Sequence, residues 1–297
     1  MRVYVTGGYG FLGSRVSSLL SASGHEVYRD RSKALDLTDG PGVLGAIAIN
    51  KPEAIIHCSG LVGGMLDNRK RPASYLADNI RMGLNILDVA KEIGVKVVMA
   101  GSSCMYPSPC EGPYSPSDLW DGRPYEGNSG YGIAKRVLCE AAISYRKEYM
   151  VDAFTCVLPN LYGPCADGGE SGHFVSSIVI KIREAKYIGA NVVEMLGDGT
   201  DRRELIYVDD AARALMFSME RDFDTGFMNF GSGEEFTISF VAEAIKSAVG
   251  YKGGIAWGGT EGNGQKRKIM DSSEAFRLGW RREVPLIEGI PLTVKGA

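Results

Sequence analysis

The sequence predicts an α/β fold, in which a doubly wound, mostly parallel sheet is joined to a smaller C-terminal α/β lobe. One observation is a β-branched and aromatic run at 2–6 that stops at a glycine-rich turn and leads into a helical segment. Another is the alternation of short apolar runs with longer amphipathic segments along the chain. Strands that alternate with helices are typical of a parallel sheet covered on both faces, the Rossmann-type arrangement.

The predicted elements follow in chain order. The first part contains strands at 25–29, 53–58, 95–100 and 152–158, and helices at 14–22, 74–93 and 131–149. The composition changes at Cys165, after which a helix at 174–185 and a strand at 192–196 begin a second unit. The segments expected to return to the first domain are 205–208, 209–219 and 227–230. A helix follows at 239–249, and the last stretch is expected to be turn-rich. We therefore predict one domain over 1–164 and 205–232, and a lobe over 165–204 and 233–297.

Charge and composition exclude several classes of function. The formal net charge is −3 and the pI is about 5.8, so no basic field attracts nucleic acid or an anionic membrane. No apolar run reaches the ~18 residues of a membrane span, and we expect the N-terminal run to be a strand rather than a leader peptide. The six cysteines include no Cys-x-x-Cys pair, and the three histidines lie far apart. We expect reduced thiols, a cytoplasmic location and no metal site.

The turn after the first strand has the pattern of a dinucleotide-binding fingerprint. Gly7, Gly10 and Gly13 surround Phe11 and Leu12 between a strand and a helix. Glycines let the backbone close on a pyrophosphate, and the free N–H groups of the helix N-terminus favour anions. We predict that these five residues bind a dinucleotide cofactor.

The end of the second strand bears on the choice of cofactor. Arg31 falls where an NAD-preferring chain carries an acid for the ribose hydroxyls, and an arginine there would pair with the 2′-phosphate of NADP(H). Asp30 is one residue away, so a shift of one residue in the register would favour NAD instead. In the next loop, Asp36 and Leu37 would contact the adenine, or the acid would cap a turn.

A Tyr-x-x-x-Lys pair is the first candidate for chemistry. Tyr131 and Lys135 are four residues apart, so they lie on one helix face, and an ammonium beside a phenol favours the phenolate. Ser102 and Cys104 follow an apolar strand, and the carboxyl ends of strands are where open α/β sheets bind ligands. His57, at the end of another apolar strand, is interpreted as a packed core residue.

With these motifs, the chain resembles the extended short-chain dehydrogenase/reductase family from Val3 to about Trp280. The most specific are 61–65 (LVGGM), 101–107 (GSSCMYP), 131–135 (YGIAK) and 160–164 (NLYGP). The resemblance is greatest to NADPH-dependent members that epimerise C3 and C5 and reduce C4 of a GDP-activated 4-keto-6-deoxy sugar. It implies a nucleotide-sugar substrate and a homodimer paired through the helices at 74–93 and 131–149.

The resemblance also implies roles for single residues. Ser102 would hydrogen-bond the C4 carbonyl, Tyr131 would protonate its oxygen, and Lys135 would tune Tyr131 and hold the nicotinamide ribose. Cys104 and His173 would move the acidic protons at C3 and C5. Cofactor contacts are also implied for Pro159, Asn160 and Leu161, and substrate contacts for Asn160, Lys181, Arg203 and Lys268.

Three alternatives remain open on the sequence. A nucleotide-sugar 4-epimerase with tightly bound NAD has the same fold but needs no thiol and imidazole pair. A simple 4-keto reductase would also need neither group. A non-catalytic nucleotide-binding member would lack Ser102, Tyr131 or Lys135, and all three are present. A dehydratase is disfavoured, because it would carry an acidic residue in the loop of Cys104.

Overall fold

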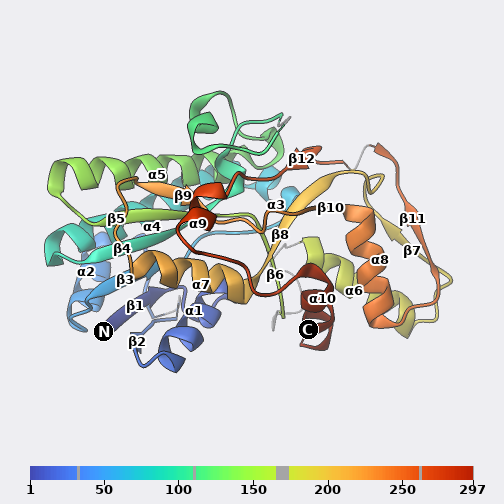
Figure 1. The fold of residues 1–297 in the computed structure, drawn as a ribbon, viewed down its shortest axis with the longest axis horizontal. Coiled ribbons are helices and arrows are strands. Elements are labelled where there is room, and N and C mark those ends of the chain that lie inside the picture. The colour runs from blue at the N-terminus through green and yellow to red at the C-terminus, as the bar shows by residue number, and fades with distance from the viewer. Residues whose placement is uncertain (32–33, 110–111, 165–173, 261–262, 297) are drawn as a thin grey trace.

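The structure is a computed structural model that describes residues 1–31, 34–109, 112–164, 174–260 and 263–296. Six parallel strands form the main sheet, in the order β2-β1-β3-β4-β5-β9 (Figure 1). They are β1 (Arg2–Thr6), β2 (Glu26–Tyr28), β3 (Ala54–His57), β4 (Lys96–Ser102), β5 (Ala153–Leu158) and β9 (Phe227–Asn229). The chain leaves β1 toward β2 and returns on the other side as β3. The switch point, where a doubly wound sheet binds its ligand, therefore lies between β1 and β3.

Helices cover both faces of this sheet. On one face pack α1 (Phe11–Ala22) and α7 (Val208–Met219), and on the other α2 (Gly40–Ala48), α4 (Pro72–Ile93) and α5 (Ser129–Tyr149). The strands alternate accordingly: Val3 and Val5 join the core beneath α1 and α7, whereas Tyr4 joins the core beneath α4. The period of two residues thus supplies one apolar face to each helical layer, as the sequence predicts.

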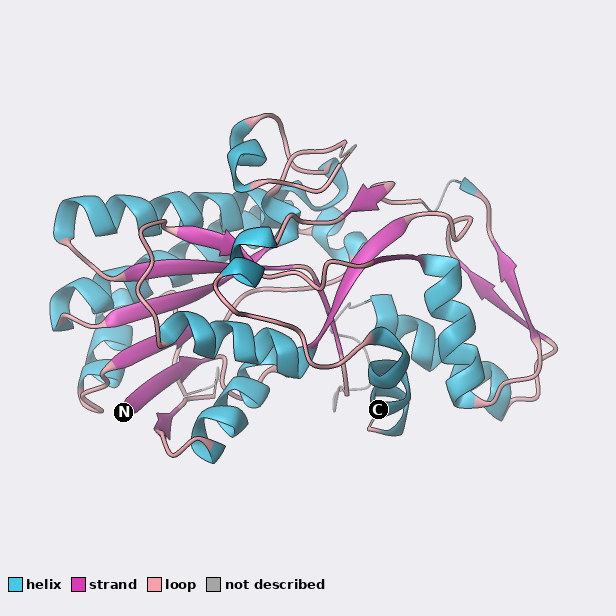
Figure 2. Ribbon diagram, viewed as in Figure 1, coloured by secondary structure: helices cyan, strands magenta, loops and turns pink. Residues whose placement is uncertain are grey.

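The remaining strands lie beside the main sheet, at the right in Figure 2. One sheet contains β6 (Asn160–Tyr162), β8 (Arg202–Tyr207), β10 (Glu235–Thr237) and β12 (Arg267–Lys268). A parallel pair is formed by β7 (Val192–Met195) and β11 (Gly254–Trp257). The helices of this part are α6 (Phe174–Tyr187), α8 (Ile238–Val249) and α10 (Leu286–Lys295). They share a second apolar core with β7 and β8.

Several elements differ from the sequence predictions. The strand expected at 205–208 is β8, and it pairs with β6, β10 and β12 rather than with the main sheet. Helices α2, α3 (Met65–Lys70), α9 (Ser273–Arg277) and α10 were not predicted. The sequence of α2 is apolar almost throughout, so it lacks a helical period, and α10 contains Pro291. Both helices are instead stabilised by packing against neighbouring elements.

The division of the chain into a domain and a lobe stays a prediction, and the packing crosses the predicted boundary. Ala275 and Trp280, from the segment assigned to the lobe, are buried in the core of the main sheet. The ring of Trp280 meets that of Phe230 edge to face, with centroids 5.4 Å apart. No helix formed by the described residues is both long and apolar enough to cross a membrane.

Candidate active site

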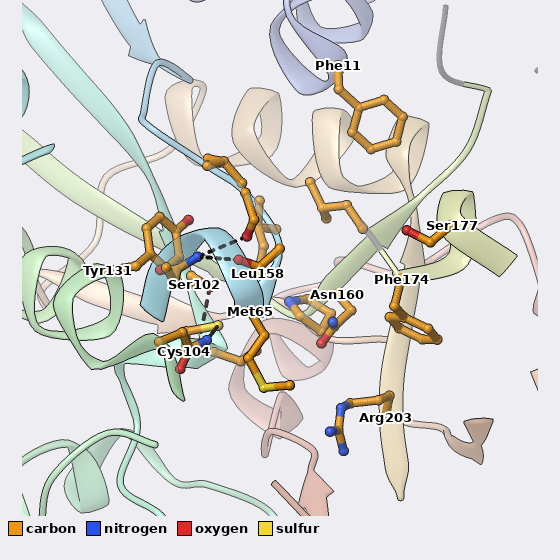
Figure 3. Close-up of a pocket in the computed structure, with 18 of the residues that line it drawn as sticks. Phe11, Met65, Ser102, Cys104, Tyr131, Leu158, Asn160, Phe174, Ser177 and Arg203 are labelled. Carbon is orange, nitrogen blue, oxygen red and sulfur yellow. Dashed lines mark hydrogen bonds between the residues drawn. The ribbon is translucent and has the colours of Figure 1, made fainter. Parts of the chain in front are cut away.

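A cavity of about 1330 Å³ opens along the carboxyl edge of the main sheet and extends to the second set of strands (Figure 3). In Figure 3, Ser102, Cys104 and Tyr131 lie on one side of the cavity, and Phe174, Ser177 and Arg203 lie on the other. The predicted site residues in its wall are Gly7, Gly10, Phe11, Leu12, Arg31, Ser102, Cys104, Tyr131, Lys135, Pro159, Asn160, Leu161, Lys181, Arg203 and Lys268. The fold therefore brings together segments that are more than 250 residues apart in the chain.

The glycine turn has the shape of a pyrophosphate cradle. Gly7 adopts a φ of +65°, and its carbonyl accepts a hydrogen bond of 2.8 Å from the Gly10 N–H. A Cβ on Gly13 would lie 2.2 Å from the Gly7 oxygen, so only glycine lets α1 start this close to the strand. Gly10 caps α1 without a side chain, which leaves the first N–H groups of the helix facing the cavity. The turn therefore fits a dinucleotide, although Gly13 acts through packing and does not line the cavity.

Two arginines and a tyrosine form the rim beyond this turn. The guanidinium carbons of Arg29 and Arg31 lie 4.3 Å and 4.6 Å from the centroid of the Tyr9 ring. Arg29 also donates a 3.0 Å hydrogen bond to the Gly8 carbonyl. The carboxylate of Asp30 accepts a hydrogen bond from the buried hydroxyl of Tyr4. The two arginines outnumber the exposed Asp30, so the net charge of this rim is positive, which suits a phosphate.

Asp36 and Leu37 do not lie in the wall of the cavity. The carboxylate of Asp36 accepts hydrogen bonds from the Thr38 N–H, at 2.9 Å, and from the Thr38 hydroxyl, at 2.8 Å. These two hydrogen bonds lower the pKa of Asp36. Leu37 is buried in the core beneath α4. Asp36 therefore caps a turn, which is one of the two roles predicted for it. An adenine contact for Asp36 or Leu37 stays a prediction.

Ser102, Tyr131 and Lys135 meet where β4 ends and α5 begins. Lys135 is buried, and its ammonium donates a 2.8 Å hydrogen bond to the Ala100 carbonyl. Its nitrogen lies 5.8 Å from the centroid of the Tyr131 ring. Burial lowers the pKa of Lys135 to about 8. Ser102 hydrogen-bonds the Tyr131 hydroxyl.

The expected effect of Lys135 on the tyrosine is wrong for this structure. Burial, followed by the charge of Cys104, raises the pKa of Tyr131, and the hydrogen bond from Ser102 opposes the rise only in part. The ammonium of Lys135 points at a backbone carbonyl instead of the phenol oxygen. Tyr131 is therefore held as a neutral phenol, which is the form that donates a proton.

Cys104 lies between donors from two other parts of the chain. Its Sγ atom is 3.1 Å from the Lys268 ammonium and 3.2 Å from the Asn128 amide nitrogen. Burial raises the pKa of Cys104, but the charge of Lys268 and the hydrogen bonds from Ser102, Lys268 and Asn128 outweigh it, and the net pKa is lowered. The other described cysteines that titrate, Cys58, Cys139 and Cys156, have raised pKa values because they are buried. Cys104 is thus the thiol among them that is set up to ionise.

The remaining predicted residues line the cavity on the side of β6, β8 and α6. Asn160 begins β6, and Figure 3 shows it between Leu158 and Arg203. Arg203 is buried beside Asp201, with 3.4 Å between the nitrogen and the carboxylate oxygen. Lys181 donates to the Glu194 carbonyl at 3.3 Å. His173 lies outside the described residues, so its role stays a prediction.

A family model described as "NAD dependent epimerase/dehydratase family" matches residues 3–231. The chain belongs to this epimerase/dehydratase family. That membership confirms the resemblance to the extended short-chain dehydrogenases/reductases drawn from the sequence.

His57 is confirmed as a core residue, because it is buried and its Nδ1 is 2.8 Å from the Thr6 hydroxyl.

Relatives of this epimerase/dehydratase chain match over nearly its whole length. A protein named putative GDP-L-fucose synthase 2, from Oryza sativa, is 35% identical over 97% of this chain and 84% of its own. The crystal structure of a GDP-L-fucose synthetase from Naegleria fowleri bound to NADP has a TM-score of 0.90 and 27% identity, and the match covers 99% and 92% of the two chains. A GDP-mannoheptose C4 reductase from Campylobacter jejuni with NADP bound has a TM-score of 0.90 and 26% identity, covering 99% and 97%.

One residue of the site, Asn128, was not predicted from the sequence. Asn128 is the N-cap of α5, a position where an amide usually bonds the helix backbone. Here its side chain makes no such bond and donates to Cys104 instead, while its carbonyl oxygen is buried without a partner among the described residues. An asparagine three residues before Tyr131 was the available signal, but a cap is the ordinary reading of that position.

Proposed function

We propose that the protein uses NADPH to convert a GDP-activated 4-keto-6-deoxy sugar, by epimerisation at C3 and C5 and reduction at C4. The observation that carries this proposal is the placement of Cys104. Its activated thiol lies two residues from Ser102 and faces the same cavity as Tyr131 and Lys135. A reductase or a 4-epimerase has no use for an ionisable thiol there, whereas carbon acids next to a ketone need a base. The names of the relatives support the GDP-sugar and the cofactor.

The proposed cofactor supplies a hydride to C4 of the sugar, and the chain supplies the proton. The neutral phenol of Tyr131 is the donor to the C4 oxygen, and the hydroxyl of Ser102 orients that oxygen. Gly7, Gly10 and the N-terminus of α1 hold the pyrophosphate, and Lys135 holds the nicotinamide ribose. Arg31, beside Arg29 and Tyr9, holds the 2′-phosphate.

Epimerisation uses the same C4 oxygen. Removing a proton from C3 or C5 leaves charge on that oxygen as an enolate, which Ser102 and Tyr131 stabilise by hydrogen bonding. We assign the thiolate of Cys104 as one proton carrier and His173 as the other. Arg203 and Lys181, with Asn160, would contact the nucleotide sugar, as would Lys268.

Two matched substitutions test this proposal. Cys104→Ser removes an ionisable group at almost unchanged volume, so exchange of the C3 and C5 protons with deuterated water should stop while NADPH still binds. Tyr131→Phe should do the reverse: deuterium enters the sugar, but NADPH oxidation slows by ~10²–10⁴-fold because a general acid is lost. Deuterium exchange at the wild-type rate in Cys104→Ser would overturn the epimerase assignment and favour a simple 4-keto reductase.

The proposal extends to assembly and location. A homodimer paired through α4 and α5 is proposed, because these two long helices pack side by side along one face of the main sheet (Figure 1). A monomer at micromolar concentration in light scattering would contradict it. A cytoplasmic location is proposed because Cys58, Cys104, Cys139 and Cys156 are all free thiols. The division into a cofactor domain (1–164 and 205–232) and a substrate lobe (165–204 and 233–297) is kept as part of the proposal.

A further inference from the structure

Two buried cations from adjacent strands of the second set, β8 and β12, line the cavity. Lys268 of β12 pairs in parallel register with Arg203 of β8, and both residues are less than a tenth exposed. A buried cation is costly unless an anion compensates it. Arg203 has such an anion in Asp201, 3.4 Å away.

The group that faces Lys268 is a thiol rather than a carboxylate. Among the described residues, no Asp or Glu oxygen lies within 4.0 Å of its ammonium. Its hydrogen-bond partner is the Sγ atom of Cys104, at 3.1 Å and 164 positions away in the chain. If Cys104 is a thiolate, the two adjacent cations each have one anion, and the charges of these four groups balance.

The backbone that directly follows Lys268 is fixed by hydrogen bonds, which restricts the position of this side chain. The Met270 N–H donates to the buried carboxylate of Glu204 at 3.0 Å, and the Tyr114 N–H donates to the Ile269 carbonyl at 2.9 Å. The same Glu204 carboxylate accepts the Gly233 N–H at 2.9 Å. Because the stem of Lys268 is itself buried, its charge cannot swing away into solvent as an exposed lysine would.

We propose that Lys268 is the counter-cation that keeps Cys104 ionised, with the Asn128 amide as a second donor to the same sulfur. This assigns Lys268 to the proton-transfer chemistry, whereas the sequence analysis assigned it to substrate phosphate or sugar. The use of the thiolate as an epimerisation base rests on the proposed function. The ionisation itself does not, because it depends only on the groups around Sγ.

The charge of the pair also explains why the thiol can be partly buried and still ionise. Burial by itself disfavours a thiolate, and it raises the pKa of the other buried thiols of this chain. An opposite charge within ~4–6 Å typically shifts a pKa by ~1–3 units toward the charged form. Lys268 is the cation that hydrogen-bonds the sulfur, so its removal should reverse the balance at Cys104.

The test is the pH dependence of Cys104 alkylation by iodoacetamide, a neutral reagent, followed by mass spectrometry of the peptide that contains Cys104. The thiolate is the reacting form, so the midpoint of the rate reports its ionisation. In the wild-type protein the midpoint should lie below the ~8.5 of a free thiol. Lys268→Met and Lys268→Gln should raise it enough to slow alkylation at pH 7 by about tenfold or more. Lys268→Arg should keep it low.

Matched controls separate this effect from general electrostatics and from misfolding. Lys266→Met removes one positive charge from an exposed position two residues away and should leave the midpoint unchanged. NADPH titration of each variant reports whether the cavity is intact, and Cys104→Ser shows the signal from other thiols. An unchanged midpoint in Lys268→Met and Lys268→Gln, or an equal rise in Lys266→Met, would overturn the proposal.

The outcomes also distinguish this inference from the proposed function. A lowered midpoint that depends on Lys268, in a protein that exchanges no deuterium into the sugar, would keep the ion pair and reject the epimerase. Normal deuterium exchange, together with an alkylation midpoint that does not change when Lys268 is substituted, would keep the epimerase and reject the ion pair.

Discussion

The choice between NADPH and NADH can be tested at the cationic rim of the cavity. We expect Arg31→Ala to weaken NADPH binding while leaving NADH binding nearly unchanged. The two cofactors differ only in the 2′-phosphate, and Arg31 is an exposed cation whose guanidinium stacks on Tyr9. Asp30, the acid that would favour NADH, is hydrogen-bonded to the Tyr4 hydroxyl.

The size of the effect follows from the contact that is lost. A hydrogen bond to a charged group contributes about 1.5–3 kcal/mol, and each ~1.4 kcal/mol changes a dissociation constant tenfold. Because Arg31 is exposed and Arg29 remains beside it, we expect the lower half of that range, a loss of roughly 10- to 40-fold. Arg29→Ala together with Arg31→Ala should lose more, since no guanidinium would then face the phosphate.

Fluorescence titration with each cofactor is the assay, and the ratio of the two dissociation constants is the quantity to compare. Arg277→Ala is the matched control, because that exposed arginine pairs with Glu274 away from the cavity. Raising the salt concentration should weaken NADPH more than NADH in the wild-type protein. Equal losses for both cofactors in Arg31→Ala would refute the reasoning, and weaker NADH binding in Asp30→Asn would show that the acid sets the choice.

Three further predictions follow from single features of the structure. Gly13→Ala should abolish NADPH binding in the same titration, because its Cβ would lie 2.2 Å from the Gly7 oxygen, whereas Gly45→Ala, in α2 with open space around it, should keep it. The rate of NADPH oxidation should fall as the pH rises through about 8, where the ammonium of Lys135 loses its proton, and Lys135→Arg should shift that fall to higher pH. Phe154→Ala should lower the free energy of unfolding by ~3–5 kcal/mol in urea titrations, since the ring is buried and stacks on Phe223, while Tyr187→Ala on the surface should change it little.

The sequence was informative wherever function depends on neighbouring residues. A strand, a turn and a helix in succession predicted the glycine cradle, and the spacing of Tyr131 and Lys135 placed both on one helix face. The carboxyl ends of parallel strands meet at one edge of a sheet, so the loop of Ser102 could be expected near the cofactor. These inferences need only local geometry and the order of the strands.

Contacts between distant segments could not be predicted in the same way. The approach of Lys268 to Cys104 depends on β12, a strand of two residues whose pattern in the sequence is too short to detect. The direction in which Lys135 donates depends on the position of the Ala100 carbonyl, and the rise in the pKa of Tyr131 depends on its burial in the folded chain, so neither could be predicted from the spacing of the two residues. Asp36 likewise accepts a hydrogen bond from the nearby Thr38 N–H, and this turn could not be distinguished from a cofactor contact in the sequence.

The proposed chemistry also fixes the order of its steps. Protons at C3 and C5 are acidic only while C4 is a ketone, because the enolate needs the carbonyl oxygen to carry its charge. Reduction turns that oxygen into a hydroxyl and ends the acidity, so epimerisation must come first. In both steps the side-chain hydroxyls of Ser102 and Tyr131 face the C4 oxygen of the sugar. A single site can therefore serve both reactions provided that Tyr131 keeps its proton during enolate formation, and the raised pKa of Tyr131 meets that condition.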